Sequence, residues 1–165
     1  MVNRFSKARL VHWLSATLVI LAGVAPNDTE AQRALLVYDQ TNERVVVSQN
    51  PRRLAYPASL TKVMTLFVIF DELESGALAL SDTWEVSNKA SSIVPTKMGL
   101  RAGSSVDVET VIKALIVKSA NDAAVVAAEG ISGSESQFAD RMNTAARTLG
   151  MSDTHLGMII LYTGV

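Results

Sequence analysis

The feature that most constrains the fold is an apolar run of helical spacing that follows a proline. Pro57 suits the first turn of a helix, and no helix breaker follows before Gly76. The apolar positions recur with the period of one helical face: Leu60, Val63, Met64, Phe67, Val68 and Phe70. The sequence therefore predicts a helix over residues 57–75, with Ser59 close to its N-terminus.

Ser59 and Lys62 stand three positions apart at the start of this helix. At that spacing the two side chains share a helical face, so the amine can take the proton of the hydroxyl as it attacks an acyl carbon. The free N–H groups of a helix N-terminus favour a developing oxyanion. The alternative is a buried helix in which Ser59 and Lys62 are ordinary first-turn residues.

A second polar group interrupts the helical pattern at Ser119 and Asn121. These residues follow an apolar run over residues 111–117 and precede an Ala- and Val-rich run, so they are expected on a turn between two helices. One interpretation is structural, with Asn121 or Asp122 as an N-cap. The other is catalytic, because Ser-x-Asn after Ser-x-x-Lys is the second element of penicillin-recognising enzymes.

With these motifs in their order, the chain resembles the low-molecular-mass penicillin-binding proteins, which are serine D-alanyl-D-alanine carboxypeptidases. The resemblance extends from about Leu35 to Leu156. It is carried by residues 57–62 (Pro-Ala-Ser-Leu-Thr-Lys), 98–103 (Met-Gly-Leu-Arg-Ala-Gly), 118–124 (Lys-Ser-Ala-Asn-Asp-Ala-Ala), Phe138, Met142, Asn143, 149–151 (Leu-Gly-Met) and Thr154.

The resemblance implies a role for each matching residue. Ser59 would be the nucleophile that becomes the acyl-enzyme, Lys62 its base, and Ser119 the relay of the proton to the leaving amine. Asn121 would bind the substrate backbone. The implied substrates are peptidoglycan pentapeptide stems, with beta-lactam antibiotics as acylating analogues and no cofactor or metal. A lysine base needs a lowered pKa; Lys118 could supply a nearby charge or be a solvated helix-end residue.

The family's third element, a Lys-Thr-Gly on a sheet strand, has no match in this sequence. After Leu156 the sequence departs from the family pattern, which points to a frameshift, a premature stop or a misassembled gene. Residues 162–164 (Tyr-Thr-Gly) are a poor replacement because tyrosine carries no cation. The open alternatives are a carboxypeptidase, an inactive fragment or binding module of that family, and, more weakly, a beta-lactamase.

The expected fold class is α+β, a partial penicillin-binding transpeptidase-like fold. Strands over residues 34–38 and 45–48 would form an N-terminal hairpin around a turn at 39–44. Residues 81–103 are expected to be largely irregular. The last three sheet strands and the closing helix of the family would be missing. Further helices of a helical subdomain are predicted over residues 108–117, 122–129 and 134–149.

The N-terminus predicts export. Arg4, Lys7 and Arg9 precede an uncharged apolar stretch over residues 10–25, which is the layout of a secretory signal peptide. Cleavage after Ala31 would leave residues 32–165 as the N-terminal part of the catalytic domain, in the periplasm or on the outer face of the cytoplasmic membrane. An uncleaved anchor is the alternative, although the stretch is short for a membrane span.

Composition excludes several other classes. The chain has no cysteine, so disulfides and thiolate metal sites are ruled out. His12 and His155 lie far apart in the sequence and form no ligand cluster. The formal net charge is -1, which lacks the basic excess of a nucleic-acid-binding protein.

Overall fold

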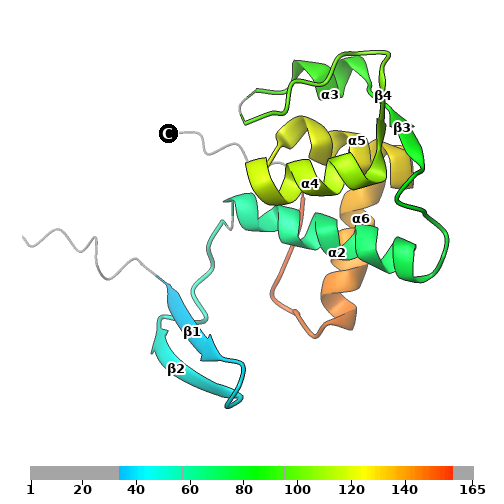
Figure 1. Ribbon diagram of the computed structural model, residues 1–165. Coiled ribbons are helices and arrows are strands. Elements are labelled where there is room, and N and C mark those ends of the chain that lie inside the picture. Colours follow the sequence, from blue (N-terminus) through cyan, green and yellow to red (C-terminus); the bar gives the residue numbers. More distant parts are fainter. Residues whose placement is uncertain (1–33, 57, 95, 158–165) are drawn as a thin grey trace, which may run out of the picture. The chain divides into compact units, whose positions relative to one another are not determined.

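The structure is a computed structural model that describes residues 34–56, 58–94 and 96–157 (Figure 1). The predicted signal peptide and residues 162–164 lie outside the described residues. The chain divides into two units, Met1–Ala55 and Tyr56–Val165. The first contains a β-hairpin and the second contains all the helices of the described residues.

The hairpin confirms the predicted pair of strands and their turn. β1 (Leu35–Asp39) pairs antiparallel with β2 (Arg44–Gln49), and a bulge lies between Val37 and Tyr38. Asp39 shapes the turn, because its Oδ1 accepts the N–H groups of Thr41 and Asn42, each at 3.1 Å. Its Oδ2 accepts the Asn42 side-chain amide at 2.7 Å. Asp39 therefore acts as an Asx-turn residue.

The second unit is mainly helical and confirms each predicted helix within a few residues. Two of these helices begin with side-chain caps, since Asp107 accepts the N–H of Thr110 and Ser134 accepts that of Gln137. The elements are η1 (Ala58–Leu60), α2 (Thr61–Glu74), β3 (Thr83–Glu85), α3 (Asn88–Ser92), β4 (Ser105–Asp107), α4 (Val108–Lys118), α5 (Asn121–Ser132) and α6 (Glu135–Thr148).

Most of the described residues in 81–103 are irregular, as predicted, but the prediction missed two short elements in this segment. These are β3 and α3, and β3 pairs antiparallel with β4, with Trp84 opposite Val106. The pairing continues past β3, where Val86 donates to Ser104 at 2.8 Å and accepts from Gly103 at 2.9 Å. Three-residue strands are too short to show a local alternation, and their pairing joins distant parts of the sequence, so no periodicity indicated them.

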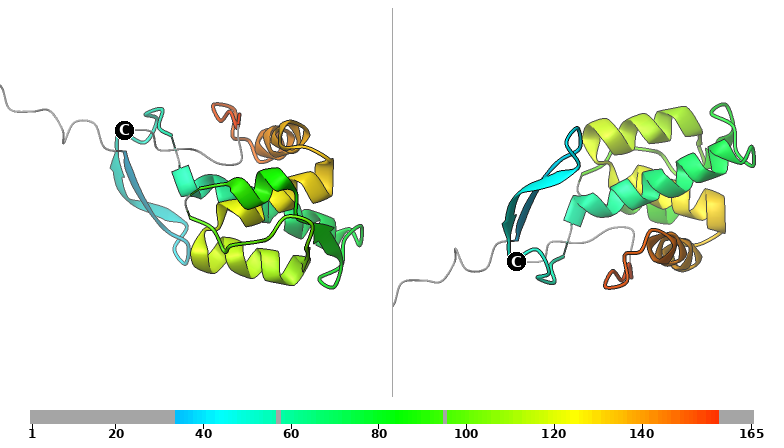
Figure 2. Two further views of the ribbon diagram at one scale, coloured as in Figure 1. Left: turned by 90° about the horizontal axis from the view of Figure 1, so that it is seen from above. Right: turned by 90° about the horizontal axis from the view of Figure 1, so that it is seen from below.

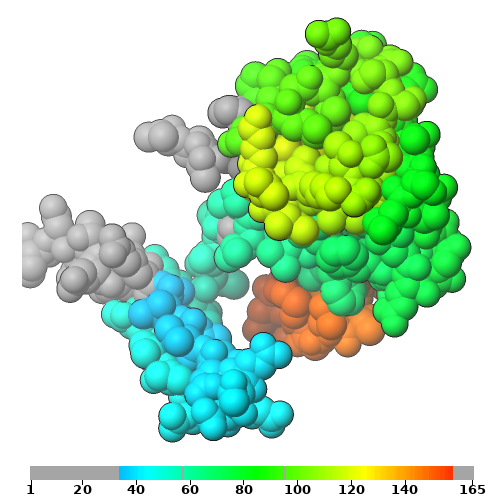
Figure 3. All heavy atoms as spheres, viewed as in Figure 1, coloured from blue at the N-terminus to red at the C-terminus, as the bar shows by residue number. Residues whose placement is uncertain are grey.

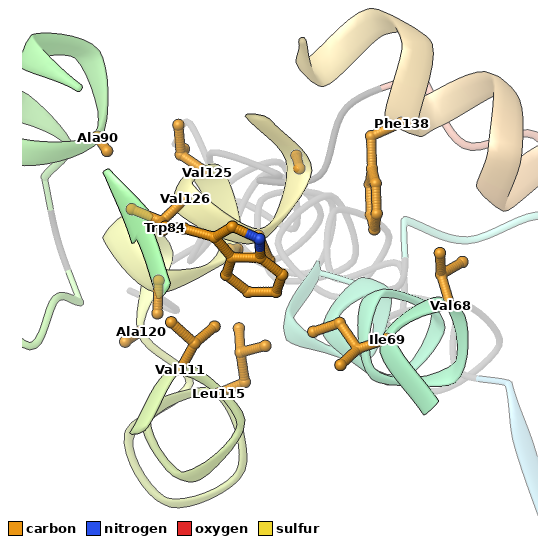
Figure 4. Packing of buried hydrophobic residues seen from close by; sticks show 14 of the residues in the cluster. Val68, Ile69, Trp84, Ala90, Val111, Leu115, Ala120, Val125, Val126 and Phe138 are labelled. Carbon is orange, nitrogen blue, oxygen red and sulfur yellow. The ribbon is translucent and has the colours of Figure 1, made fainter. Parts of the chain in front are cut away.

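The core of the helical unit surrounds α5. All residues from Ala123 to Ala128 are fully buried, and α5 contacts α2, α3, α4, α6 and β3. Figure 4 shows the Trp84 ring among side chains of neighbouring helices, including Val111 and Leu115 of α4. The glycine at position 130 leaves room for the Trp84 ring, since a Cβ there would lie 2.4 Å from the indole. Small residues on α5 let its neighbours approach closely.

Polar contacts join the helices at the edge of this core. Arg141 of α6 pairs with Glu72 of α2, and Lys89 of α3 pairs with Glu135 of α6 at 2.5 Å. Asn143 holds the segment after α6: its side chain donates to the carbonyl of Leu156 and accepts the N–H of Leu156, both at 2.8 Å. Among the described residues, no helix is both long enough and apolar enough to cross a membrane.

Candidate active site

Ser59 lies on η1, a single 3-10 turn, and α2 begins two residues later at Thr61. Its side chain is exposed. The turn is formed with a positive φ of 47° at Ala58, a conformation that is unfavourable for a residue with a Cβ. The N-cap residue of α2, Leu60, makes no side-chain cap bond. The structure thus presents Ser59 immediately before the uncapped first turn of a helix.

Lys62 lies in the first turn of α2 and is only 7% exposed. Burial lowers the pKa of its amine, because the charged form is disfavoured away from water. No carboxylate pairs with Lys62 among the described residues, and the Lys118 side chain is exposed. The lowered pKa therefore comes from burial, and Lys118 behaves as a solvated helix-end lysine.

Ser119 and Asn121 occupy the turn between α4 and α5, as predicted. Ser119 is the C-cap of α4 in the left-handed conformation, with φ 52°, and Asn121 is the first residue of α5 and 8% exposed. The alternative interpretation, in which Asn121 or Asp122 is the N-cap, does not hold: the N-cap of α5 is Ala120, with no side-chain cap bond. The Asn121 N–H donates to the carbonyl of Thr96 at 2.7 Å, and the Asp122 carboxylate is used elsewhere.

The start of α2 and the turn from α4 to α5 lie at the same end of the helical unit (Figures 1 and 2). Consistent with this, α2 contacts both α4 and α5. Ala58 and Ser119 are the two described non-glycine residues of this unit with positive φ. Local backbone strain tends to collect at functional sites, and here both strained residues fall at this end of the unit. No sequence signal indicated either of them.

Asp122 is a residue of this region whose role sequence reasoning missed. It is fully buried and accepts N–H groups of Met98, Gly99 and Leu100. Burial alone would raise the pKa of Asp122, but these backbone N–H groups outweigh it and hold the pKa below its ordinary value. A carboxylate after Asn121 resembles an N-cap in the sequence, and nothing in the local pattern pointed to the 98–100 backbone.

The arrangement joins an exposed hydroxyl, a buried amine of lowered pKa and a second serine on a nearby turn. A serine hydroxyl three residues from a buried amine of lowered pKa is a combination suited to acyl transfer. Among the described residues, no group of three or more His, Cys, Asp or Glu side chains could hold a metal ion.

Comparison with known families identifies the relationship. The sequence profile of the D-alanyl-D-alanine carboxypeptidases, peptidase group S11, matches residues 21–158. The chain belongs to this family. It is 36% identical to D-alanyl-D-alanine carboxypeptidase DacF of Bacillus subtilis over 125 residues, which make up 76% of this chain and 32% of that relative. The chain spans about a third of the length of the curated D-alanyl-D-alanine carboxypeptidases that it matches.

Solved structures confirm the expected penicillin-binding transpeptidase-like fold. The D-alanyl-D-alanine carboxypeptidase DacD of Francisella tularensis matches with a TM-score of 0.76 at 32% identity. The matched region makes up 80% of this chain and 32% of that protein. Penicillin-binding protein D2 of Listeria monocytogenes, solved in the ampicillin-bound form, matches with a TM-score of 0.64 at 25% identity. The matched region makes up 84% of this chain and 56% of that protein. The described residues of this chain contribute two small sheets to that fold, β1 with β2 and β3 with β4.

Proposed function

We propose that this chain carries the acyl-enzyme site of a serine-type D-alanyl-D-alanine carboxypeptidase. The observation that supports it most is the buried amine of Lys62, whose pKa is lowered by burial, three residues after the exposed Ser59. A lowered pKa favours the neutral amine, which is the form that can accept a proton, whereas an exposed lysine at neutral pH is already protonated. The proposed substrates are peptidoglycan pentapeptide stems that end in D-alanyl-D-alanine, reached after export.

In the proposed reaction the Ser59 Oγ attacks the carbonyl of the penultimate D-alanine, and Lys62 takes the hydroxyl proton. The C–N bond breaks, and Ser119 relays a proton to the leaving nitrogen, so the terminal D-alanine departs as an amine. Asn121 holds the substrate backbone during this step. Water then hydrolyses the ester on Ser59. A beta-lactam follows the same first step, but its leaving nitrogen stays attached to the acyl group.

Covalent labelling with a fluorescent penicillin tests this proposal. Ser59→Ala should abolish the label, and Lys62→Ala should nearly do so, because an unassisted serine hydroxyl is a poor nucleophile at neutral pH. Ser136→Ala, at an exposed position of α6, is a matched control that should leave labelling unchanged. Mass spectrometry should place the adduct on Ser59. An adduct on Ser119 would show that the assigned roles are wrong.

One observation favours a second candidate, a non-catalytic fragment or binding module of the same family. Val63, Phe67 and Phe70 on one face of α2 are exposed by 61%, 40% and 48%, and Leu60, the N-cap residue of α2, is exposed by 68%. In Figure 3 the atoms of α2 form a band of surface between those of α4 and α6. An apolar face of this kind is typical of a surface that binds another element. A chain that is labelled at Ser59 but releases no D-alanine from a D-alanyl-D-alanine peptide would support this candidate.

A further inference from the structure

Three consecutive backbone N–H groups converge on the carboxylate of Asp122. Met98 donates to Oδ1 at 2.9 Å, and Gly99 and Leu100 donate to Oδ2 at 2.8 and 3.1 Å. A concave run of N–H groups is an arrangement that binds anions, and hydrogen bonds to a charged acceptor are stronger than neutral ones. The Asp122 side chain is 0% exposed, so water does not compete for these donors.

The backbone of Asn121 holds the same segment a second time. Its N–H donates to the carbonyl of Thr96 at 2.7 Å. Residues 96–100 are therefore fixed to the start of α5 at two points, one on each side of Lys97. The side chains of Thr96, Lys97 and Met98 are exposed. The segment thus presents three side chains next to Asn121 on a backbone that has little freedom.

We propose that Asp122 is a positioning residue of the candidate active site, which fixes residues 96–100 beside Asn121 at the edge of that site. This role presupposes the proposed function, since the position of residues 96–100 affects the chemistry only if an acyl donor binds next to Asn121. Asp122 acts through the backbone of the segment and touches no substrate. Without the hydrogen bonds of Asp122, residues 96–100 can move. Misplacement of a bound substrate by about 1 Å can lower the rate about 100-fold.

Two variants of the full chain weaken these hydrogen bonds, one at the acceptor and one at the donor backbone. Asp122→Asn removes the charge and turns one acceptor into a donor that faces N–H groups. Because this change leaves buried donors unpaired and endangers the fold, Gly99→Ala is the second variant. Gly99 has φ +93°, and a Cβ there meets nothing within 4 Å, so alanine strains the anchored backbone without a clash. Gly76→Ala is the matched control, with φ +74° and equally free space just after α2.

The first measurement is amide hydrogen exchange. We expect exchange at Met98, Gly99 and Leu100 to be about tenfold faster or more in Asp122→Asn and Gly99→Ala, with exchange in α6 unchanged. Gly76→Ala should leave the three amides as they are in the original chain. A merely structural role would instead accelerate exchange in α6 as well. Unchanged exchange at the three amides in both variants would overturn the proposal.

The second measurement is the rate of Ser59 labelling by a fluorescent penicillin. It should fall about 10- to 100-fold in Gly99→Ala and stay unchanged in Gly76→Ala, although the two alanines strain the backbone similarly. Faster exchange with an unchanged labelling rate would overturn the positioning role, because the segment would then be anchored but would not border the site. If the original chain is not labelled at Ser59, the proposed function fails, while the exchange data still decide whether Asp122 fixes the segment.

Discussion

The hairpin and the helical unit are both rich in apolar residues, yet only the helical unit has an interior of its own. In the hairpin, Leu36 and Val46 are 58% and 55% exposed, and no residue of β1 or β2 is buried. In the helical unit, Ile69, Phe138 and Met142 are fully buried. Apolar content alone therefore does not decide whether a segment builds a core; the number of elements that can pack around it does.

The pattern of the hairpin explains this difference. β1 and β2 carry consecutive apolar residues rather than an alternation of apolar and polar positions, as in Leu-Leu-Val-Tyr and Val-Val-Val. Such runs are typical of strands that are covered on both faces, and a two-stranded hairpin is marginally stable by itself. The helical unit instead surrounds one small-residue helix, α5, with neighbours on several sides. We therefore expect mutations to have large effects in the helical unit and small effects in the hairpin.

The largest expected effect tests this contrast directly. Phe138→Ala removes a fully buried ring from α6 and should lower the free energy of unfolding of the helical unit by about 3–5 kcal/mol. Val46→Ala, in the exposed hairpin, should change it by no more than about 0.5 kcal/mol. Urea unfolding followed by far-ultraviolet circular dichroism measures both. Equal losses for the two variants would show that the hairpin and the helical unit share one core.

The same contrast separates what could be predicted from the sequence from what could not. Long helices such as α2 and α6 were predicted within a few residues, because apolar residues recur in them at helical spacing. The same spacing did not show which face of α2 is buried, since Met64 and Val68 are buried while Val63 and Phe67 are exposed. The hairpin was predicted from its two apolar runs around a polar turn. The pairing of β3 with β4 was missed because it depends on residues far apart in the sequence.

The site shows the same division. Ser59, Lys62, Ser119 and Asn121 were singled out because their motifs are local. The positive φ angles of Ala58 and Ser119 were not foreseen, since neither residue is a glycine, the residue that normally signals this conformation. The bonds of Asp122 to residues 98–100 join segments of the chain that are far apart in sequence, and an aspartate at a helix start is more often a cap.

A middle-sized effect is expected where the site and the core of the helical unit meet. Burial of Lys62 disfavours its charge and lowers its pKa, so burying this side chain costs stability at any pH at which the unfolded chain carries the charge. Lys62→Met removes the charge and leaves an unbranched side chain that is one heavy atom shorter. We expect it to raise the free energy of unfolding by about 0.5–2 kcal/mol and to nearly abolish labelling of Ser59 by penicillin.

The pH dependence of stability provides the check on Lys62→Met. The pKa of this lysine is lower in the folded chain than in the unfolded chain. At pH values between the folded pKa and the ordinary value of about 10.4, the unfolded chain therefore binds more protons than the folded chain. Stability of the original chain should therefore rise with pH in this window relative to Lys62→Met, so the advantage of the variant should shrink as the pH rises. A variant that is less stable than the original chain at neutral pH would show that Lys62 has a stabilising partner.

The smallest expected effect concerns the turn of the hairpin. The side-chain amide and then the N–H of Asn42 lower the pKa of Asp39, against a smaller opposing effect of burial. Because the folded pKa lies below the ordinary value of about 3.9, the contribution of Asp39 is complete above that value and is lost as the pH falls through the folded pKa. An acid titration followed by nuclear magnetic resonance should therefore shift the Thr41 and Asn42 amides at a midpoint below about 3.9, and Asp39→Asn should remove this transition. Amides of α6 should not shift at the same midpoint. If they do, and if the shift disappears in Asp39→Asn, the turn of the hairpin is coupled to the helical unit. The contrast between a hairpin without a core and a helical unit with one would then be wrong.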